Sequence, residues 1–167
     1  MPTYQTVRRV PYTPEAMLDL VADVECYPQF LPLCDSLKVL SRKRDTDGSE
    51  LIVARMGVGY GPLHESFTSQ VQISRARNQI LVSYIDGPFR MLRNTWTFCA
   101  GPTGCDVDFH IVYEFKSLAL QLLLGSMFDR AFRKFSEAFE TRARKIYGTH
   151  PDDSGTGKML PAATTAI

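Results

Sequence analysis

The sequence predicts an α+β helix-grip fold, in which a curved antiparallel sheet of about seven strands surrounds a long C-terminal helix, with two short helices after the first strand. Two patterns predict this fold. Residues 36–115 form short apolar and β-branched runs separated by turn residues such as Gly, Pro, Asn and Asp, which indicates a meander of about six strands. Residues 118–147 repeat large apolar side chains every three or four positions, as an amphipathic helix does.

The segment before the meander contains the other elements. Residues 3–10 alternate as a strand does, and Thr13 followed by Pro14 resembles a helix start, so we expect a helix through about Val24. Residues 27–32 hold two prolines among large apolar side chains, which allows at most a short, broken helical segment. That segment should present aromatic surface.

The final helix, if continuous from Leu118 to Tyr147, would be about 45 Å long, which exceeds the width of a small domain. Gly125 lies in its interior, where glycine costs about 1 kcal/mol relative to alanine. We therefore predict a break near Gly125. Residues 118–124 would then act as a lid over a cavity, and residues 128–139 would grip the sheet.

The size and composition of the chain indicate one domain. The sequence has 167 residues, 44% of them hydrophobic, which suffices for a single core over residues 1–148. Residues 149–167, rich in small and polar residues, predict a disordered C-terminal tail. The N-terminus lacks the apolar run of a signal peptide, so we expect no export. The missing transit peptide favours a bacterial cytoplasmic protein, with peripheral contact at the inner membrane as a further option, although a processed mitochondrial chain would look the same.

The charge balance argues against a general nucleic-acid binder. Nineteen basic and eighteen acidic residues leave a net charge of +1, so we expect no DNA partner. Basic residues do cluster at residues 42–44 and 142–145. Such clusters are most often solvated surface, but they also suit contact with an anionic membrane surface or ribosomal RNA. The four cysteines lack metal-site spacing, so we expect reduced thiols and no metal.

The sequence offers little for catalysis. His64 and His110 fall on the polar parity of their strands, and His150 lies at the edge of the tail. The glycine-rich run at residues 57–61 precedes a strand rather than a helix, which favours a hairpin over a nucleotide loop. No nucleophile motif accompanies a base, so we expect a protein that is not an enzyme.

Glu65 is the most unusual charged residue. It shares strand parity with Leu63, Phe67 and Val71, which places a carboxylate on the apolar face of the sheet. A buried, unpaired carboxylate is costly, so Glu65 should meet a donor, a cation or water. It either lines the polar mouth of a pocket or reaches solvent at the strand end.

Several ordered motifs resemble a known family. They are Tyr27-Pro28, Phe30-Leu31-Pro32 with Cys34, Glu65-Ser66-Phe67-Thr68-Ser69, Leu92-x-Asn94-x-Trp96-x-Phe98, Tyr113-Glu114-Phe115-Lys116-Ser117 and Phe139-Glu140-x-Arg142-Ala143. Together, over about residues 1–148, they resemble the coenzyme Q-binding protein family of the START-related polyketide cyclase superfamily, whose bacterial members are often labelled ribosome association toxins. Leu33 stands where that family commonly has a tryptophan, which would soften one wall of the site.

The resemblance implies a START-like lipid-binding domain with a hydrophobic tunnel and no catalytic residues. Our hypothesis is non-enzymatic binding of ubiquinone or a similar prenyl lipid by a quinone carrier or chaperone that supports respiration, with no required cofactor. The alternative is a toxin that binds the large ribosomal subunit and blocks subunit association; a cyclase or hydrolase is a weaker third option. The expected ligand contacts are Tyr27, Phe30, Leu31, Glu65, Phe67, Tyr84, Phe89, Leu92, Trp96, Phe115, Phe128, Phe132 and Phe135.

Overall fold

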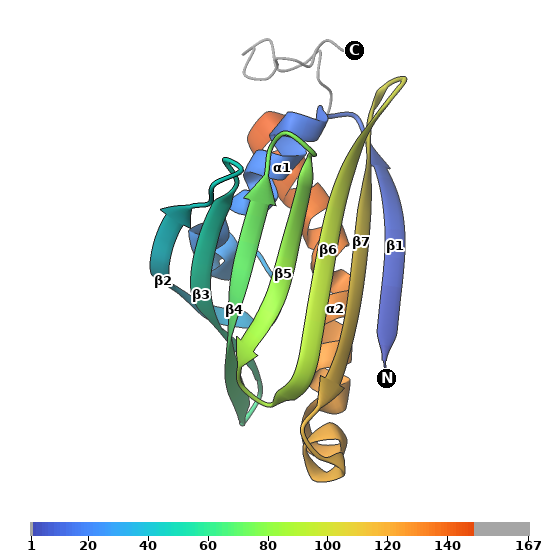
Figure 1. Ribbon diagram of the computed structural model, residues 1–167. Helices are drawn as coiled ribbons and strands as arrows, with labels where there is room; N and C mark the ends of the chain where they lie inside the picture. The colour runs from blue at the N-terminus through green and yellow to red at the C-terminus, as the bar shows by residue number, and fades with distance from the viewer. Residues whose placement is uncertain (1, 149–167) are drawn as a thin grey trace.

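The protein is described here by a computed structural model, which covers residues 2–148 (Figure 1). Seven antiparallel strands form one sheet in the order β1-β7-β6-β5-β4-β3-β2. The elements are β1 (Thr3–Val10), α1 (Pro14–Ala22), the 3₁₀ helix η1 (Val24–Gln29), β2 (Cys34–Arg44), β3 (Glu50–Tyr60), β4 (Leu63–Ser74), β5 (Gln79–Asp86), β6 (Phe89–Gly101), β7 (Gly104–Phe115) and α2 (Leu118–Tyr147). The predicted fold class and the six strands after the first are confirmed.

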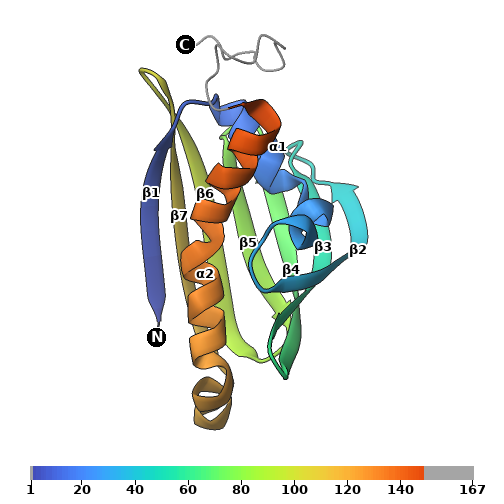
Figure 2. The same ribbon diagram turned by 180° about the vertical axis from the view of Figure 1, so that it is seen from behind.

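The helices all lie on one face of the sheet. Figure 2 shows α2 crossing this face along its length, with α1 and η1 beside it. Strands β2 to β7 pair in sequence order, and β1 pairs with β7 to form one edge of the sheet, so the first and last strands of the chain are neighbours. The chain therefore encloses its core between the sheet and α2.

Strand β7 shows how the sequence assigns its two faces. Its buried and half-buried residues alternate along the whole strand, as the period of a β-strand requires. The buried set is Cys105, Val107, Phe109, Ile111, Tyr113 and Phe115. This apolar face is the one that carries the helices.

Local sequence signals set the helix boundaries. The Thr13 hydroxyl accepts a hydrogen bond from the backbone N–H of Ala16 at 3.0 Å, and Ser117 caps α2 in the same way at Leu120. Gly148 follows α2 with a φ of 94°, a conformation that favours glycine. The first helix is shorter than predicted, because the chain changes to the 3₁₀ helix η1 at Val24.

The predicted break at Gly125 is wrong. Helix α2 runs without interruption through its thirty residues. The penalty for one interior glycine is about 1 kcal/mol, whereas each large side chain buried beneath the helix contributes about 1.5–3 kcal/mol. Leu124, Met127 and Phe128 are buried on either side of the glycine and hold the helix in register.

The predicted lid is also wrong. Leu118 and Leu122 are 70% and 78% exposed, and the first turns of α2 project beyond the sheet rather than covering it (Figures 1 and 2). Within residues 2–148, no helix is long and apolar enough to cross a membrane. The predicted disordered tail at residues 149–167 lies outside the described residues.

Candidate ligand-binding cavity

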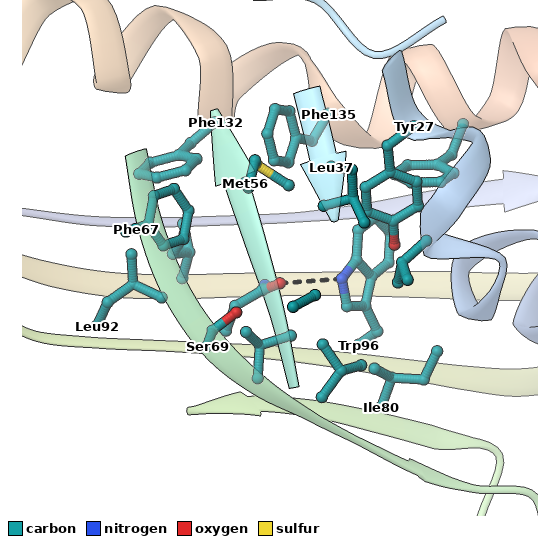
Figure 3. A pocket seen from close by; sticks show the side chains of 17 residues that line it. Tyr27, Leu37, Met56, Phe67, Ser69, Ile80, Leu92, Trp96, Phe132 and Phe135 are labelled. Atoms are coloured by element: carbon teal, nitrogen blue, oxygen red, sulfur yellow. Dashed lines mark hydrogen bonds between the residues drawn. The ribbon is translucent and has the colours of Figure 1, made fainter. Parts of the chain in front are cut away.

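A small apolar cavity lies between the sheet and the middle of α2 (Figure 3). Its volume is about 60 Å³. Strands β2 to β7 supply most of the lining, η1 closes one side and α2 forms the roof. The lining residues are Val24, Tyr27, Leu37, Ala54, Met56, Phe67, Ser69, Val71, Ile80, Val82, Leu92, Asn94, Trp96, Ile111, Phe132, Phe135 and Phe139.

Trp96 on β6 is the largest side chain of the cavity wall. Its ring packs edge-on against Phe109 and Phe139, with centroid distances of 4.7 and 5.1 Å. Its indole N–H donates to the Asn94 side-chain oxygen at 3.0 Å (Figure 3), and the Asn94 amide donates to the carbonyl of His110 at 3.0 Å. The polar groups of this wall are therefore paired within the wall, which keeps its surface apolar.

Tyr27 places a second aromatic ring at the η1 side of the cavity. Its hydroxyl donates to the carbonyl of Val21 at the end of α1, which fixes the ring. Burial raises the pKa of the Tyr27 phenol well above its usual range, so the side chain stays neutral. Tyr27 therefore acts as an aromatic wall whose only polar group is already paired.

The structure brings together about half of the predicted contact residues. Those that line the cavity are Tyr27, Phe67, Leu92, Trp96, Phe132 and Phe135. Those that do not line it are Phe30, Leu31, Glu65, Tyr84, Phe89, Phe115 and Phe128. Leu33, which was expected to soften one wall, is not part of the lining either.

Phe89, Phe115 and Phe128 pack on one another instead. Phe89 lies 4.9 Å from Phe115 and 5.0 Å from Phe128 between ring centroids, and Phe67 and Tyr84 also contact Phe89. This aromatic cluster packs beneath the first half of α2. Inward orientation was predicted correctly for these rings, but inward orientation alone does not place a residue beside empty volume.

Glu65 does not line this cavity, and it lies near the strand end, which is the second of its two predicted placements. It is half-buried near the start of β4, where its carboxylate accepts a hydrogen bond from the backbone N–H of Ser66 at 3.1 Å. Burial is the main cause of a raised pKa at Tyr84, and the negative charges of Asp86 and Glu65 add to it. The predicted strand parity of Glu65 is correct, but its carboxylate is accessible to water because the residue lies near the end of the strand.

Eleven lining residues were not predicted: Val24, Leu37, Ala54, Met56, Ser69, Val71, Ile80, Val82, Asn94, Ile111 and Phe139. Phe139 carried a usable signal, because it follows Phe135 by four positions on the same helix face. Small residues such as Ala54 and Ser69 carry no such signal, although their short side chains are what leaves the volume open.

A wider groove lies outside the cavity, between η1 and the C-terminal half of α2. Its volume is about 380 Å³. The Arg142 guanidinium lies over the Phe30 ring at 5.0 Å and donates to the Gln29 side chain at 3.2 Å. The groove residues are Gln29, Phe30, Pro32, Lys134, Glu137, Ala138, Thr141, Arg142 and Lys145.

Three aromatic rings separate the groove from the cavity. Phe30 lines the groove, Tyr27 and Phe139 line the cavity, and the three ring centroids lie 5.1–6.2 Å apart. We refer to Tyr27, Phe30 and Phe139 as the aromatic partition. Phe30 is half-buried while the other two rings are buried, so Phe30 has the most freedom to move.

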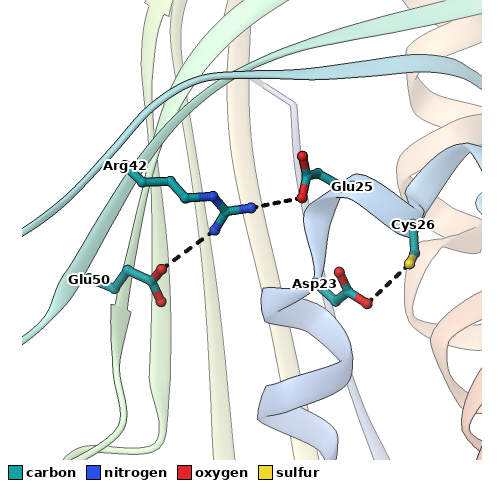
Figure 4. A network of polar contacts seen from close by, with 5 residues as sticks. All are labelled: Asp23, Glu25, Cys26, Arg42 and Glu50. Carbon is teal, nitrogen blue, oxygen red and sulfur yellow. Dashed lines mark hydrogen bonds and ion pairs between the residues drawn. The ribbon is translucent and has the colours of Figure 1, made fainter.

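Ion pairs tie η1 to the sheet edge (Figure 4). Arg42 on β2 donates to Glu25 of η1 at 2.9 Å and to Glu50 of β3 at 3.5 Å. These side chains are partly exposed, so each pair contributes about 0–1 kcal/mol. Arg42 belongs to the basic cluster at residues 42–44, and its pairing with two carboxylates weakens the case for that cluster as an anion site.

A curved antiparallel sheet closed by one long helix over an apolar cavity defines a START-like, helix-grip protein. The chain belongs to the family of polyketide cyclases, dehydrases and lipid transport proteins, whose model matches residues 10–140. The predicted relationship is confirmed.

The named relatives include members of both groups that the sequence motifs suggested. The chain is 35% identical to the ribosome association toxin RatA of Rickettsia prowazekii, across 87% of this chain and 99% of the relative. It is 34% identical to the mitochondrial coenzyme Q-binding protein COQ10 homolog B of Xenopus laevis, across 87% of this chain and 59% of that protein. The solution structure of an 18 kDa Caulobacter crescentus protein is 32% identical, with a TM-score of 0.71 and coverage of 89% and 99%.

Proposed function

We propose that this protein binds ubiquinone or a similar prenyl lipid in the cavity beneath α2 and acts as its carrier or chaperone in respiration. The observation that carries this proposal is an interior site lined by aromatic and aliphatic side chains whose polar groups are largely paired within the wall. A coenzyme Q-binding protein among the relatives supports this choice of ligand.

The cavity as it stands is smaller than the pockets that usually hold organic ligands. Pockets for organic ligands usually measure about 300–1,000 Å³, and this cavity measures about 60 Å³. The groove beyond the aromatic partition measures about 380 Å³. Movement of the partition would join the two spaces, so the proposed site includes the groove as its open end.

The lining favours binding over catalysis. Its seventeen residues, all within the described part of the chain, include no His, Asp, Glu, Lys or Cys. A general acid or base would have to be within hydrogen-bond reach of a bound reactant, and the tyrosine that lines the cavity is held neutral by burial. We therefore propose a ligand carrier although the family description also names cyclases and dehydrases.

Extraction of bound lipid tests this proposal. The protein is purified from its native host, extracted with organic solvent and analysed by mass spectrometry, and we expect a co-purifying prenyl quinone. Ala54→Met places a larger side chain in the cavity wall and should abolish this signal, whereas Ala100→Met, at an exposed position, should leave it unchanged. Absence of any quinone or prenyl lipid above a control protein overturns the proposal.

Ribosome association is the second candidate, and the groove favours it. Lys134, Arg142 and Lys145 line one side of the groove and Glu137 is its one acidic residue, so the groove suits a phosphate backbone. The relative from Rickettsia prowazekii carries a ribosome-association name. Co-sedimentation with ribosomal subunits in a sucrose gradient tests it. The double variant Lys134→Ala/Lys145→Ala should lose co-sedimentation, and Lys38→Ala/Lys43→Ala should retain it.

A further inference from the structure

The start of α2 carries three leucines that point into solvent. Leu118, Leu122 and Leu123 are 70%, 78% and 56% exposed. Leucine is among the residues most often found buried in proteins, so three exposed leucines within six positions form an apolar surface that nothing within residues 2–148 covers.

Two hairpin turns bring further apolar side chains to the same end of the molecule. Figures 1 and 2 show the β3–β4 turn, the β5–β6 turn and the first turns of α2 at one end. Tyr60 and Ile85, at these turns, are 51% and 52% exposed, and Arg130 of α2 lies over the Tyr60 ring at 5.3 Å. We call Tyr60, Ile85, Leu118, Leu122 and Leu123 the leucine end.

The segment that carries the three leucines has no acidic side chain. From Lys116 to Phe128 the chain has one basic residue and no acidic one, although helix starts usually favour acidic residues. Arg90 and Arg130 are exposed at the flanks. The acidic groups nearby are Asp86, the half-buried Glu65, Glu114 and Asp129. Glu114 lies 4.0 Å from Arg90, and Asp129 pairs with Arg133 at 3.0 Å.

We propose that the leucine end inserts into the surface of a lipid bilayer that contains anionic lipids. A projecting helix end with exposed leucines fits a deformable lipid surface, in which apolar side chains reach the acyl boundary while flanking cations stay at the phosphate groups. The positive end of the α2 dipole adds to this attraction. The proposal goes beyond ligand binding and holds whether or not the cavity takes up a quinone.

Vesicle co-sedimentation of the full chain tests this proposal. Phosphatidylcholine vesicles with and without phosphatidylglycerol are compared, and we expect binding that is stronger when phosphatidylglycerol is present. The triple variant Leu118→Ser/Leu122→Ser/Leu123→Ser should lower binding roughly tenfold or more. Lys116→Gln should reduce the preference for phosphatidylglycerol.

The chain offers a matched control for this triple variant. Val7, Leu40 and Ile146 are the other large apolar side chains exposed within residues 2–148, at 56%, 50% and 47%. Val7→Ser/Leu40→Ser/Ile146→Ser should bind vesicles as the unmodified protein does. Circular dichroism confirms folding of both variants. The proposal is overturned if the unmodified protein binds neither vesicle, if the leucine variant binds equally well, or if the leucines instead mediate self-association in solution.

Discussion

Trp96 and Asn94 illustrate how single residues keep the cavity apolar. The indole N–H and the Asn94 amide form a short chain of hydrogen bonds that ends at the carbonyl of His110. Both side chains are buried, at 3% and 8% exposure, so a missing partner could not readily be replaced by bulk water. Asn94 thus serves mainly to satisfy its neighbours in the wall.

Asn94→Ala should lower the free energy of unfolding by about 1–3 kcal/mol, because it leaves the Trp96 N–H and the His110 carbonyl without their partner. Urea denaturation measures this change. In a Trp96→Phe background the indole N–H is already absent, so the same substitution should cost less. Equal costs in the two backgrounds would contradict the assigned role of Asn94.

The buried thiols predict a loss of stability in alkali. Burial raises the pKa of Cys34 from 9.0 to about 11, and the pKa of Cys105 to about 12. A thiol whose pKa is higher in the folded state than in the unfolded state contributes to the free energy of unfolding. For Cys34 this contribution is complete below pH 9 and is lost as the pH rises through 11.

Removal of one thiol isolates its part of this pH dependence. Between pH 9 and 11 the free energy of unfolding should fall by up to about 2–3 kcal/mol less in Cys34→Ala than in the unmodified protein, because one pKa unit corresponds to about 1.4 kcal/mol. Denaturation at a series of pH values measures it. Cys99→Ala, at an exposed cysteine, is the control and should leave the slope unchanged. An unaltered slope in Cys34→Ala would show that its thiol does not titrate on unfolding.

At the scale of elements, helix α2 shows what periodicity predicts and what it misses. The recurrence of Phe128, Phe132, Phe135 and Phe139 correctly indicated an amphipathic helix. Intrinsic propensity at Gly125 incorrectly indicated a break, since propensity is a weak local term and burial along the helix outweighs it. Tertiary packing of this kind cannot be read from a local pattern.

Gly125→Ala should therefore stabilise the protein by about 0.5–1 kcal/mol. An added methyl group would lie 3.7 Å from the Gln121 side chain, an ordinary contact, so no clash offsets the gain in helix propensity. Thermal and urea denaturation measure the change. Ser126→Ala, at the exposed neighbouring position, should give a smaller gain. Destabilisation by Gly125→Ala would mean that the glycine serves packing or motion.

The cavity was less predictable than the elements that surround it. Strand parity placed Phe67 on the correct face, because a strand alternates regardless of its neighbours. Whether an inward ring borders open space depends on how closely the helix approaches it from across the molecule. Phe89 and Phe128 contact each other from β6 and α2 and fill that space, which no local sequence pattern reveals.

At the scale of the whole molecule, the proposed ligand would pass from the open groove through the aromatic partition into the cavity. The sheet and α2 share a continuous core, whereas η1 is one short 3₁₀ helix that contains Pro28. Gln29 and Phe30, at its C-terminal end, contact Arg142 across the groove. Tyr27 and Phe30, on the η1 side of the aromatic partition, therefore have the least regular structure behind them.

This arrangement predicts that Phe30 limits the rate of ligand uptake. Phe30→Ala removes the half-buried ring of the partition, so association should become several-fold faster while the lining of the cavity is unchanged. Trp96 is the single tryptophan of the sequence and lines the cavity, so quenching of its fluorescence by a short-tailed ubiquinone reports uptake directly in stopped-flow mixing.

Tyr4 provides a matched control for the Phe30 variant. It is also a half-buried aromatic residue beneath an arginine of α2, with the Arg133 guanidinium 4.8 Å from its ring, but it lies on β1 away from the groove. Tyr4→Ala should leave the association rate unchanged. Equal rates for Phe30→Ala and the unmodified protein would place the entrance elsewhere, and slower uptake would mean that Phe30 guides the ligand rather than obstructing it.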